Sequence, residues 1–263
     1  MGFVKEIGKY VILMFETFKR PDKGRVFRRQ LMIDFHALGV DSIGIVVFIS
    51  LFTGGIIAMQ MAYNIDNPLV PLYLVGYTTK QMMILEISPT IMSLILAGKV
   101  GSSIASEIGT MRVTEQIDAL RVMGINPANY LILPKITAAV FFFPVLVIFS
   151  IAVGLGGGLL AVTVTGSVTP TDFIDGLQSW WAPFDITYAI IKTVVFAFII
   201  ASVSGYKGYT VQGGSVEVGR ASTKAVVASS ILIIIFDLVI IGAGVIGFPL
   251  KMLARIFQSL QLP

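Results

Sequence analysis

The sequence contains no cysteine and only one histidine, His36. These absences exclude disulfides, thiolate chemistry and zinc sites of the usual His/Cys kind, so neither a catalytic residue nor a metal site is predicted, and His36 is expected on an interfacial helix. A Walker A loop is also missing, because Gly98-Lys99 is followed by Val100 instead of Ser or Thr. If ATP drives this protein, another chain must bind it.

Charged residues are scarce as well. They make up 13% of the 263 residues, against about 25% in a typical soluble domain, whereas 56% of the residues are hydrophobic and the mean hydropathy is +0.88. The chain is therefore expected to be an all-α integral membrane protein. Five mainly apolar stretches are long enough to cross a bilayer. They cover residues 39–61, 80–104, 130–165, 186–206 and 225–248.

Amphipathic segments are expected on both sides of this five-span domain, which occupies residues 39–248. In residues 1–38 the apolar side chains recur at helical spacing and charged ones lie away from them, which predicts a helix lying in the membrane interface. A basic cluster of Arg25, Arg28 and Arg29 follows and suits anionic lipid headgroups. The tail, residues 249–263, repeats the interfacial pattern.

The distribution of basic residues predicts which side each loop occupies. Residues 1–38 are rich in Lys and Arg, and further basic residues follow the second and fourth spans, whereas the first and third loops have none. Basic residues favour the cytoplasmic side, so the N-terminus is expected in the cytoplasm and the C-terminus outside. Lys251 and Arg255 in the tail are a minor violation of this rule.

A polar, regularly patterned stretch, residues 98–127, separates the second and third spans. Residues 110–123 are predicted to form one amphipathic helix with an apolar stripe on one side, closed by Gly124 and by Pro127. Such a capped helix has the shape of a coupling helix that docks a partner, and the alternative is a surface helix resting on lipid headgroups. The candidate coupling residues are Arg112, Thr114, Glu115, Gln116, Asp118 and Arg121.

The second span contains Glu86, Pro89 and Lys99. Glu86 and Lys99 lie thirteen positions apart, about 20 Å along a helix, so they cannot pair. Glu86 is expected about a turn and a half inside the outer end of the span, where an intramembrane carboxylate is a candidate functional residue. We predict a lipid path lined by Glu86 together with Ile57 and Gln60. The alternative is that Glu86 simply reaches the outer headgroups.

Several motifs together resemble one family of membrane proteins. The motifs are Ala97-Gly98-Lys99-Val100-Gly101-Ser102, Glu107 to Leu120, Met123 and Asn126-Pro127, with weaker matches at Glu86 with Pro89 and at Lys192 to Phe196. They resemble the signature of the MlaE-type permeases, the membrane subunits of MCE-associated lipid ABC transporters. The sequence departs from the family pattern at Leu85, where the family has an arginine.

This resemblance implies a homodimer in the bacterial inner membrane, with an interfacial N-terminal helix and five spans per subunit. Its implied partners are an ABC ATPase that binds ATP and Mg²⁺ and grips the helix after the second span, an extracytoplasmic MCE-domain protein, and membrane lipids, with no nucleic acid. Gly44, Gly54, Gly242 and Gly247 mark faces where a second copy is expected to pack.

The function that follows is a non-catalytic permease subunit that moves phospholipid-like molecules between the membrane and an extracytoplasmic carrier. A second hypothesis is an ion- or proton-coupled secondary transporter that uses Glu86, Lys99 and Asp237 as a relay. The positions of these three residues in the predicted spans place them at different depths, which argues against a relay. No repeat of the kind common in secondary transporters is visible.

Overall fold

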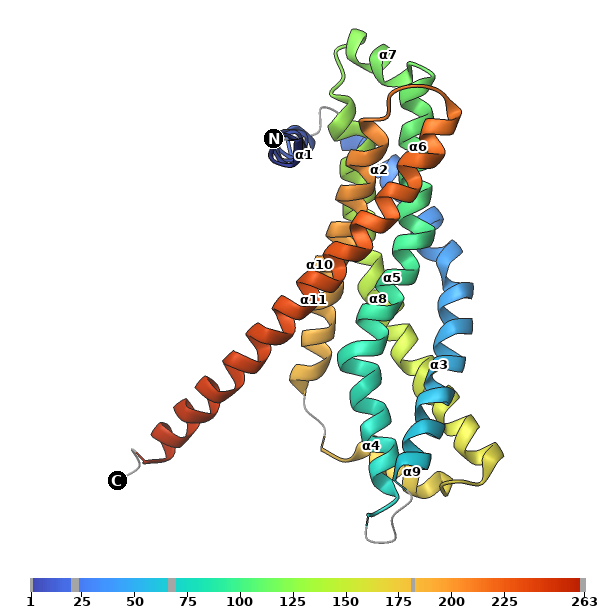
Figure 1. Ribbon diagram of the computed structural model, residues 1–263, viewed down its shortest axis with the longest axis vertical. Helices are drawn as coiled ribbons and strands as arrows, with labels where there is room; N and C mark the ends of the chain where they lie inside the picture. The colour runs from blue at the N-terminus through green and yellow to red at the C-terminus, as the bar shows by residue number, and fades with distance from the viewer. Residues whose placement is uncertain (1, 20–23, 66–69, 181–182, 261–263) are drawn as a thin grey trace.

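The structure is a computed structural model that describes the chain except residues 1, 20–23, 66–69, 181–182 and 261–263, and the side chains except also those of residues 2–3, 25, 183 and 243–260. Every regular element in the described chain is a helix (Figure 1). In order they are α1 (Gly2–Thr17), α2 (Gly24–Asp34), η1 (Phe35–Gly39), η2 (Val40–Ser42), α3 (Ile43–Asn64), α4 (Tyr73–Met82), η3 (Met83–Ile91), α5 (Met92–Leu96), η4 (Ala97–Gly101), α6 (Ser102–Val113), α7 (Gln116–Val122), α8 (Pro127–Thr165), α9 (Pro170–Gln178), α10 (Pro183–Tyr209) and α11 (Ser215–Leu260).

Five stretches of continuous helix are long and apolar enough to cross a membrane among the described residues, which confirms the predicted fold class. They are Val26–Asn64, Tyr73–Val113, Pro127–Thr165, Phe184–Tyr209 and Ser215–Gly242. The second has 41 residues. At 1.5 Å per residue this is about 60 Å, twice the hydrocarbon thickness of a bilayer, so its ends project beyond the lipid.

Helices extend further into the predicted loops than the sequence analysis expected. The second long helix begins at Tyr73, although the second span was expected to start at residue 80, and a short helix, α9, lies between the third and fourth predicted spans. The predicted separation of the tail from the fifth span lies outside the described side chains, although the backbone of α11 is helical to Leu260.

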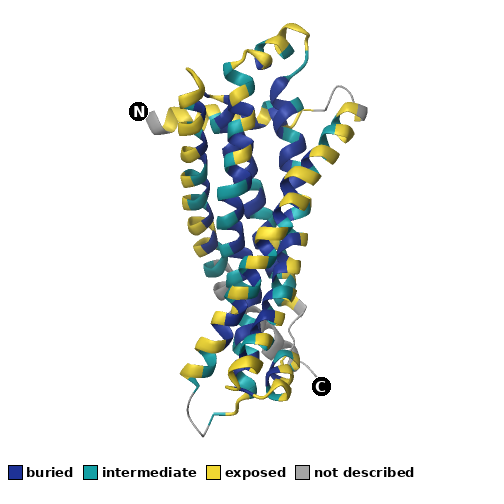
Figure 2. Ribbon diagram, turned by 90° about the vertical axis from the view of Figure 1, so that its right-hand side faces the viewer, coloured by how far each residue is buried: buried dark blue, intermediate teal, exposed yellow. Residues whose placement is uncertain are grey.

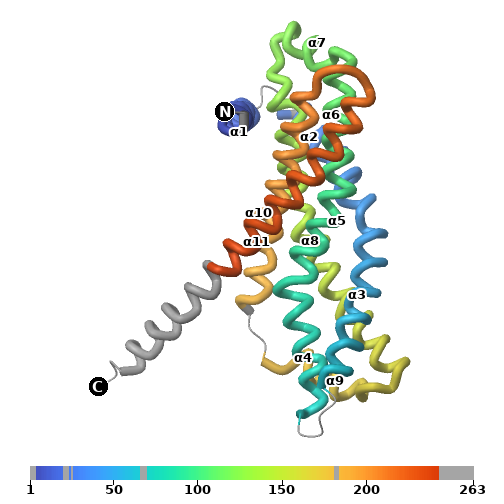
Figure 3. The backbone as a smooth tube through the Cα atoms, viewed as in Figure 1, coloured from blue at the N-terminus to red at the C-terminus, as the bar shows by residue number. Residues whose placement is uncertain are grey.

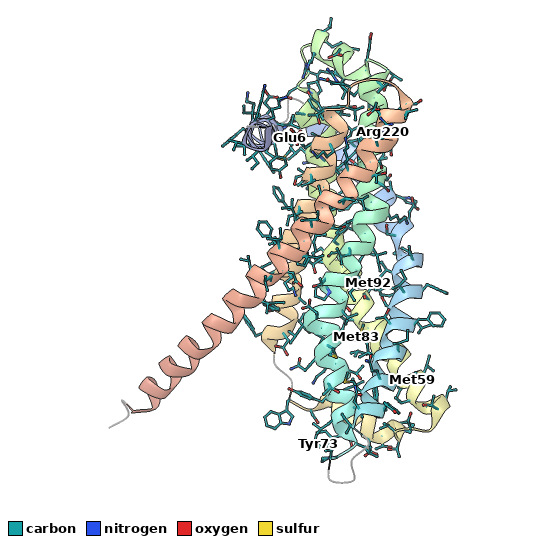
Figure 4. The ribbon with its side chains drawn as sticks, in the orientation of Figure 1. Glu6, Met59, Tyr73, Met83, Met92 and Arg220 are labelled. Atoms are coloured by element: carbon teal, nitrogen blue, oxygen red, sulfur yellow. The ribbon has the colours of Figure 1, made fainter. Side chains whose placement is uncertain are left out.

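The long helices form an elongated bundle with α7 at one end and α9 at the other (Figures 1 and 2). Figure 2 shows that burial is concentrated along the centre of the bundle. Figure 4 places Met83 and Met92 at mid-depth, Tyr73 at the α9 end and Arg220 at the α7 end. Most of the buried core comes from aliphatic and aromatic side chains of the second, third and fourth long helices, including Leu96, Ile132, Phe143 and Phe196.

Two helices depart from the bundle. The described part of α11 leans away from it toward the α9 end, and α1 runs across it near the α7 end, where Figure 1 shows it end-on (Figures 1 and 3). The outward side of α11 is apolar, with Ile234 58% and Leu238 72% exposed. Exposed aliphatic side chains on a helix of this length are typical of a surface that contacts lipid or another membrane helix.

Helices α3 and α8 approach closely through glycines. A Cβ at Gly54 would collide with the backbone carbonyl of Gly154, and a Cβ at Gly157 with that of Leu51. The prediction that Gly54 lies on a face open to a second copy is therefore wrong, because it packs inside the subunit. Gly44 and Gly242 have open space beside them, and Gly247 lies outside the described side chains.

Candidate functional site

The helix that carries Glu86 is irregular around Pro89. In an α-helix the carbonyl of Leu85 would accept a hydrogen bond from residue 89, but proline has no N–H to donate. The chain adopts a π-helix over Met83–Ile91 instead, and the ammonium of Lys192, from α10, donates to the Leu85 carbonyl at 3.0 Å. The proline thus leaves a backbone acceptor that a neighbouring helix uses.

The same ammonium joins two carboxylates from different helices. Lys192 Nζ lies 3.0 Å from Glu86 Oε2 and 2.5 Å from Asp237 Oδ1 of α11, and the hydroxyl of Thr90 donates to Asp237 Oδ2 at 3.2 Å. The ring of Tyr188 also lies near the ammonium, with its centroid 5.5 Å from Nζ. We call Glu86, Lys192 and Asp237 the ion cluster.

Burial differs sharply among the three members of the ion cluster. The side chain of Lys192 is fully buried and that of Asp237 is 9% exposed, whereas that of Glu86 is 43% exposed. Buried ions are tolerated where they are paired and hydrogen-bonded, which describes Lys192 and Asp237. Glu86 keeps an open side, so it is the member of the cluster that a ligand can reach.

Sequence reasoning singled out Glu86 but missed Lys192, which appeared only inside a family motif. The available signal was a lysine in an apolar span, which needs an anionic partner. The prediction that Glu86, Lys99 and Asp237 lie at different depths is wrong for Glu86 and Asp237, because both contact Lys192. Lys99 stands apart, and its ammonium donates to the backbone carbonyl of Asp41.

The structure also locates the other residues predicted to line the lipid path. Ile57 and Gln60 lie on α3, whereas the ion cluster is built by η3, α10 and α11. Ile57 is 6% exposed, inside the subunit, and Gln60 is exposed. Glu86 itself lies thirteen residues, about 20 Å, from the start of its helix at Tyr73, deeper in the helix than the sequence analysis expected.

The predicted coupling helix is two helices instead of one. α6 ends at Val113, and after a turn α7 covers only Gln116–Val122, so the prediction of a single helix over residues 110–123 is wrong. The break falls at Glu115, whose φ of 60° lies in the left-handed region. The predicted end is confirmed, because Gly124 has φ 75° and Pro127 begins the next helix.

Side chains hold this corner between α6 and α7 in shape. Arg112 donates to Asp118 at 2.8 Å, Arg121 lies 3.8 Å from the same carboxylate, and Arg121 also donates to the hydroxyl of Tyr209 at 2.8 Å. Ile117 is fully buried beneath them. Three of the six predicted coupling residues therefore make intramolecular contacts that shape the corner.

The outer surface of the corner is polar on one side and apolar on the other. Thr114, Glu115 and Gln116 are exposed at the turn. Met123, which belongs to the predicted apolar stripe, is 64% exposed, so that stripe is only partly buried, and Val122 beside it is 90% exposed. Exposed aliphatic side chains next to polar ones are typical of protein contact sites.

The corner is also tied to α1. Asn126 caps α8 by accepting from the amide of Ala128, and its own amide donates to the carbonyl of Glu16 at 3.0 Å. Asn129 donates to the carbonyl of Thr17 at 2.7 Å. These bonds fix the end of α1 at the junction of α7 and α8.

The middle of α1 docks on α10. The hydroxyl of Tyr10 donates to Ser202 at 2.8 Å, and burial raises the pKa of this tyrosine. Of the predicted basic cluster, Arg28 and Arg29 are exposed, as headgroup contact requires, and the side chain of Arg25 lies outside the described residues.

A second buried ion pair joins the first three long helices. Lys135 of α8 lies 2.9 Å from Asp34 and 2.7 Å from Glu107, and the side chains of Lys135 and Asp34 are 2% and 3% exposed. In the sequence Lys135 is only one of the basic residues that follow the second span. Its geometry indicates a structural role, because both carboxylates already occupy its ammonium.

The sequence of this chain is similar to those of known membrane permeases. The family described as Permease MlaE matches residues 31–242. A probable ABC transporter permease protein of Rickettsia prowazekii is 36% identical over 220 residues, covering 82% of this chain and 81% of its own. A similarly named protein of Synechocystis is 33% identical, covering 84% and 83%. The intermembrane phospholipid transport system permease protein MlaE of Haemophilus influenzae is 29% identical, covering 93% and 95%.

Proposed function

Because the chain belongs to the MlaE permease family, we propose that it is the membrane subunit of an ABC transporter that moves phospholipids between the bacterial inner membrane and an extracytoplasmic MCE carrier. The observation that carries this proposal is the family match over residues 31–242. The printed name of the Haemophilus relative, an intermembrane phospholipid transport permease, supports the choice of substrate.

The ion cluster supplies the polar part of the lipid path in this proposal. Acyl chains need an apolar surface, which the exposed aliphatic side of α11 provides, and a headgroup needs a polar contact at the same depth. Glu86 provides it, because half of its side chain is open while Lys192 and Asp237 hold it in place. Gln60 and Ile57 belong to the path only if it extends over α3.

The corner between α6 and α7 is the proposed contact for a separate ATPase, which would bind ATP and Mg²⁺. Thr114, Glu115 and Gln116 offer polar contacts, and Val122 offers an apolar one. Arg112 and Arg121 stiffen the corner. A movement of the ATPase against α7 would therefore displace α7 as a rigid element, and with it the attached ends of α8 and α1.

The proposed assembly is a homodimer with its N-terminus in the cytoplasm and its C-terminus outside. The exposed aliphatic side of α11 and the open surface at Gly44 and Gly242 are the faces available to the second copy. Native mass spectrometry of the intact complex that found one copy of this chain would contradict the dimer.

Purification in mild detergent tests the function directly. An ATPase and an MCE-domain protein should copurify with the chain, and the reconstituted complex should transfer labelled phospholipid to the carrier only when ATP is hydrolysed. Glu86→Ala should slow transfer while the complex stays assembled. If transfer proceeds at the same rate without the ATPase, the proposal is wrong.

The second candidate is a transporter driven by an ion gradient, and one observation favours it. Glu86 and Asp237 are brought together by Lys192, and such intramembrane groups serve proton relays in other transporters. Lys99 takes no part in the cluster, since it binds the backbone at Asp41. Transfer that collapses when a protonophore is added, and continues when ATP is withdrawn, would establish this second function.

A further inference from the structure

The ion cluster contains one positive and two negative groups. Lys192 contributes the only cation, and Glu86 and Asp237 contribute two carboxylates. If all three are ionised, the cluster carries one net negative charge inside a membrane span. An uncompensated charge is costly there, so a dry site needs either a proton on one carboxyl or a further cation beside the two carboxylates.

No other described cation on the three helices is near enough to supply it. Lys80 lies six residues before Glu86, about 9 Å along the helix, and its ammonium is engaged by the backbone carbonyl of Ser179. Lys99 is about 20 Å away and binds the carbonyl of Asp41. On α10 the next lysine is Lys207, fifteen residues or about 22 Å from Lys192, and it pairs with Glu6.

The described part of α11 offers no nearer cation. Its closest one in sequence is Lys224, thirteen residues or about 20 Å before Asp237. The groups beside the cluster are instead neutral: the hydroxyl of Thr90 and the phenol ring of Tyr188. Asp185, at the start of α10, is an anion that interacts with Lys80 and leaves the charge of the cluster unchanged.

The open position in the cluster is at Glu86. One oxygen, Oε2, faces Lys192, and 43% of the side chain remains accessible. Asp237 is 9% exposed and has Lys192 and Thr90 as partners, so a ligand reaches the cluster through Glu86.

We propose that Glu86 selects lipids whose headgroup carries an ammonium, because that ammonium supplies the cation that the cluster lacks. This inference rests on the proposed function and narrows its substrate to amine-bearing phospholipids. The ammonium of the headgroup donates to the open side of the Glu86 carboxylate, and Lys192 stays on Asp237. A headgroup with a net negative charge and no amine meets repulsion at the same place.

The test is a competition between headgroups on the intact reconstituted complex. Vesicles contain equal amounts of phosphatidylethanolamine and phosphatidylglycerol with identical acyl chains, and mass spectrometry measures the ratio of the two lipids that bind to the complex and that reach the carrier. The parent protein should favour phosphatidylethanolamine by about fivefold, the factor for one half-exposed ion pair. Glu86→Gln should bring the ratio close to one.

Leu85→Arg provides the gain-of-function variant, because Leu85 is the half-buried neighbour of Glu86 and an arginine there supplies the missing cation. We expect this variant to lose the preference for the amine and to bind phosphatidylglycerol better than the parent does. Lys99→Gln is the matched control, since it changes the charge of the same long helix outside the cluster and should leave the ratio unchanged.

The outcomes separate this inference from the proposed function. Equal binding of both lipids by the parent, or a preference that survives both Glu86→Gln and Leu85→Arg, overturns the selection by Glu86 while lipid transport stands. If neither lipid binds or is transferred by the parent complex, the proposed function itself fails.

Discussion

Removing the buried cation of the ion cluster should destabilise the protein more than removing any one of its anions. Lys192→Met keeps most of the side-chain volume but leaves Asp237, which is 9% exposed, without a cation, since its other neighbours are the hydroxyl of Thr90 and the carboxyl of Glu86. Losing one member of a buried ion pair costs about 3–5 kcal/mol, because the other charge stays buried and uncompensated. Glu86 adds little to this loss, because at 43% exposure it can turn toward water or headgroups.

Asp237→Asn should cost less. The ammonium of Lys192 would keep Glu86 and the carbonyl of Leu85 as partners, so the loss is that of one charge-assisted hydrogen bond, about 1.5–3 kcal/mol. The double variant Lys192→Met with Asp237→Asn removes both charges together. The loss of stability in the double variant should be smaller, by about 2 kcal/mol, than the sum of the losses in the two single variants.

Equilibrium unfolding in mixed micelles gives these free energies, and thermal melts of the same samples give Tm. For a chain of this size each kcal/mol shifts Tm by roughly 2–4 °C, so Lys192→Met should melt about 6–20 °C below the parent. Glu86→Gln is the control within the cluster and should shift Tm by only a few degrees. Additive losses in the double variant would refute the reasoning, because they would mean that Lys192 does not compensate Asp237.

Three further predictions concern packing, capping and coupling. Gly54→Leu should prevent α3 from packing on α8, because its Cβ would collide with the carbonyl of Gly154. This variant should elute as aggregate on size-exclusion chromatography, whereas the control Gly44→Leu, which has open space beside it, should elute as the parent does. Asn126→Ala should lower the free energy of unfolding by about 1–2 kcal/mol, because α8 loses its cap. It should also expose α1 to protease, because the bond to the carbonyl of Glu16 is lost, and a cleavage pattern identical to that of the parent would contradict this. Glu115→Lys should abolish ATPase association at a stability cost below about 0.5 kcal/mol, and a complex that copurifies as the parent does would remove the corner from the proposed interface.

Local patterns predicted the parts of the fold that depend on neighbouring residues. The five spans follow from the length of apolar stretches, because a bilayer imposes the same requirement on every helix that crosses it. The end of α7 at Gly124 and the start of α8 at Pro127 follow from the backbone preferences of glycine and proline. The irregular helix around Glu86 could be anticipated in the same way, from Pro89.

The sequence analysis missed the break between α6 and α7, although the break involves only a few consecutive residues. Residues 110–123 have a regular amphipathic pattern, and helical propensity alone gives no reason for Glu115 to take a left-handed conformation. The reason is tertiary: Arg121 reaches the hydroxyl of Tyr209 on α10, and Ile117 is buried, which together turn α7 away from the axis of α6.

The sequence by itself determined that this chain crosses a membrane five times as helices, and its motifs determined its family, because both are properties of contiguous residues. Only the tertiary structure decided that Glu86 and Asp237 share Lys192, which lies 106 positions after Glu86 in the chain. Only the tertiary structure, likewise, placed Gly54 inside the subunit. Hydropathy identifies a buried charge that needs a partner, but the packing of α10 between the second long helix and α11 determines which charge that partner is.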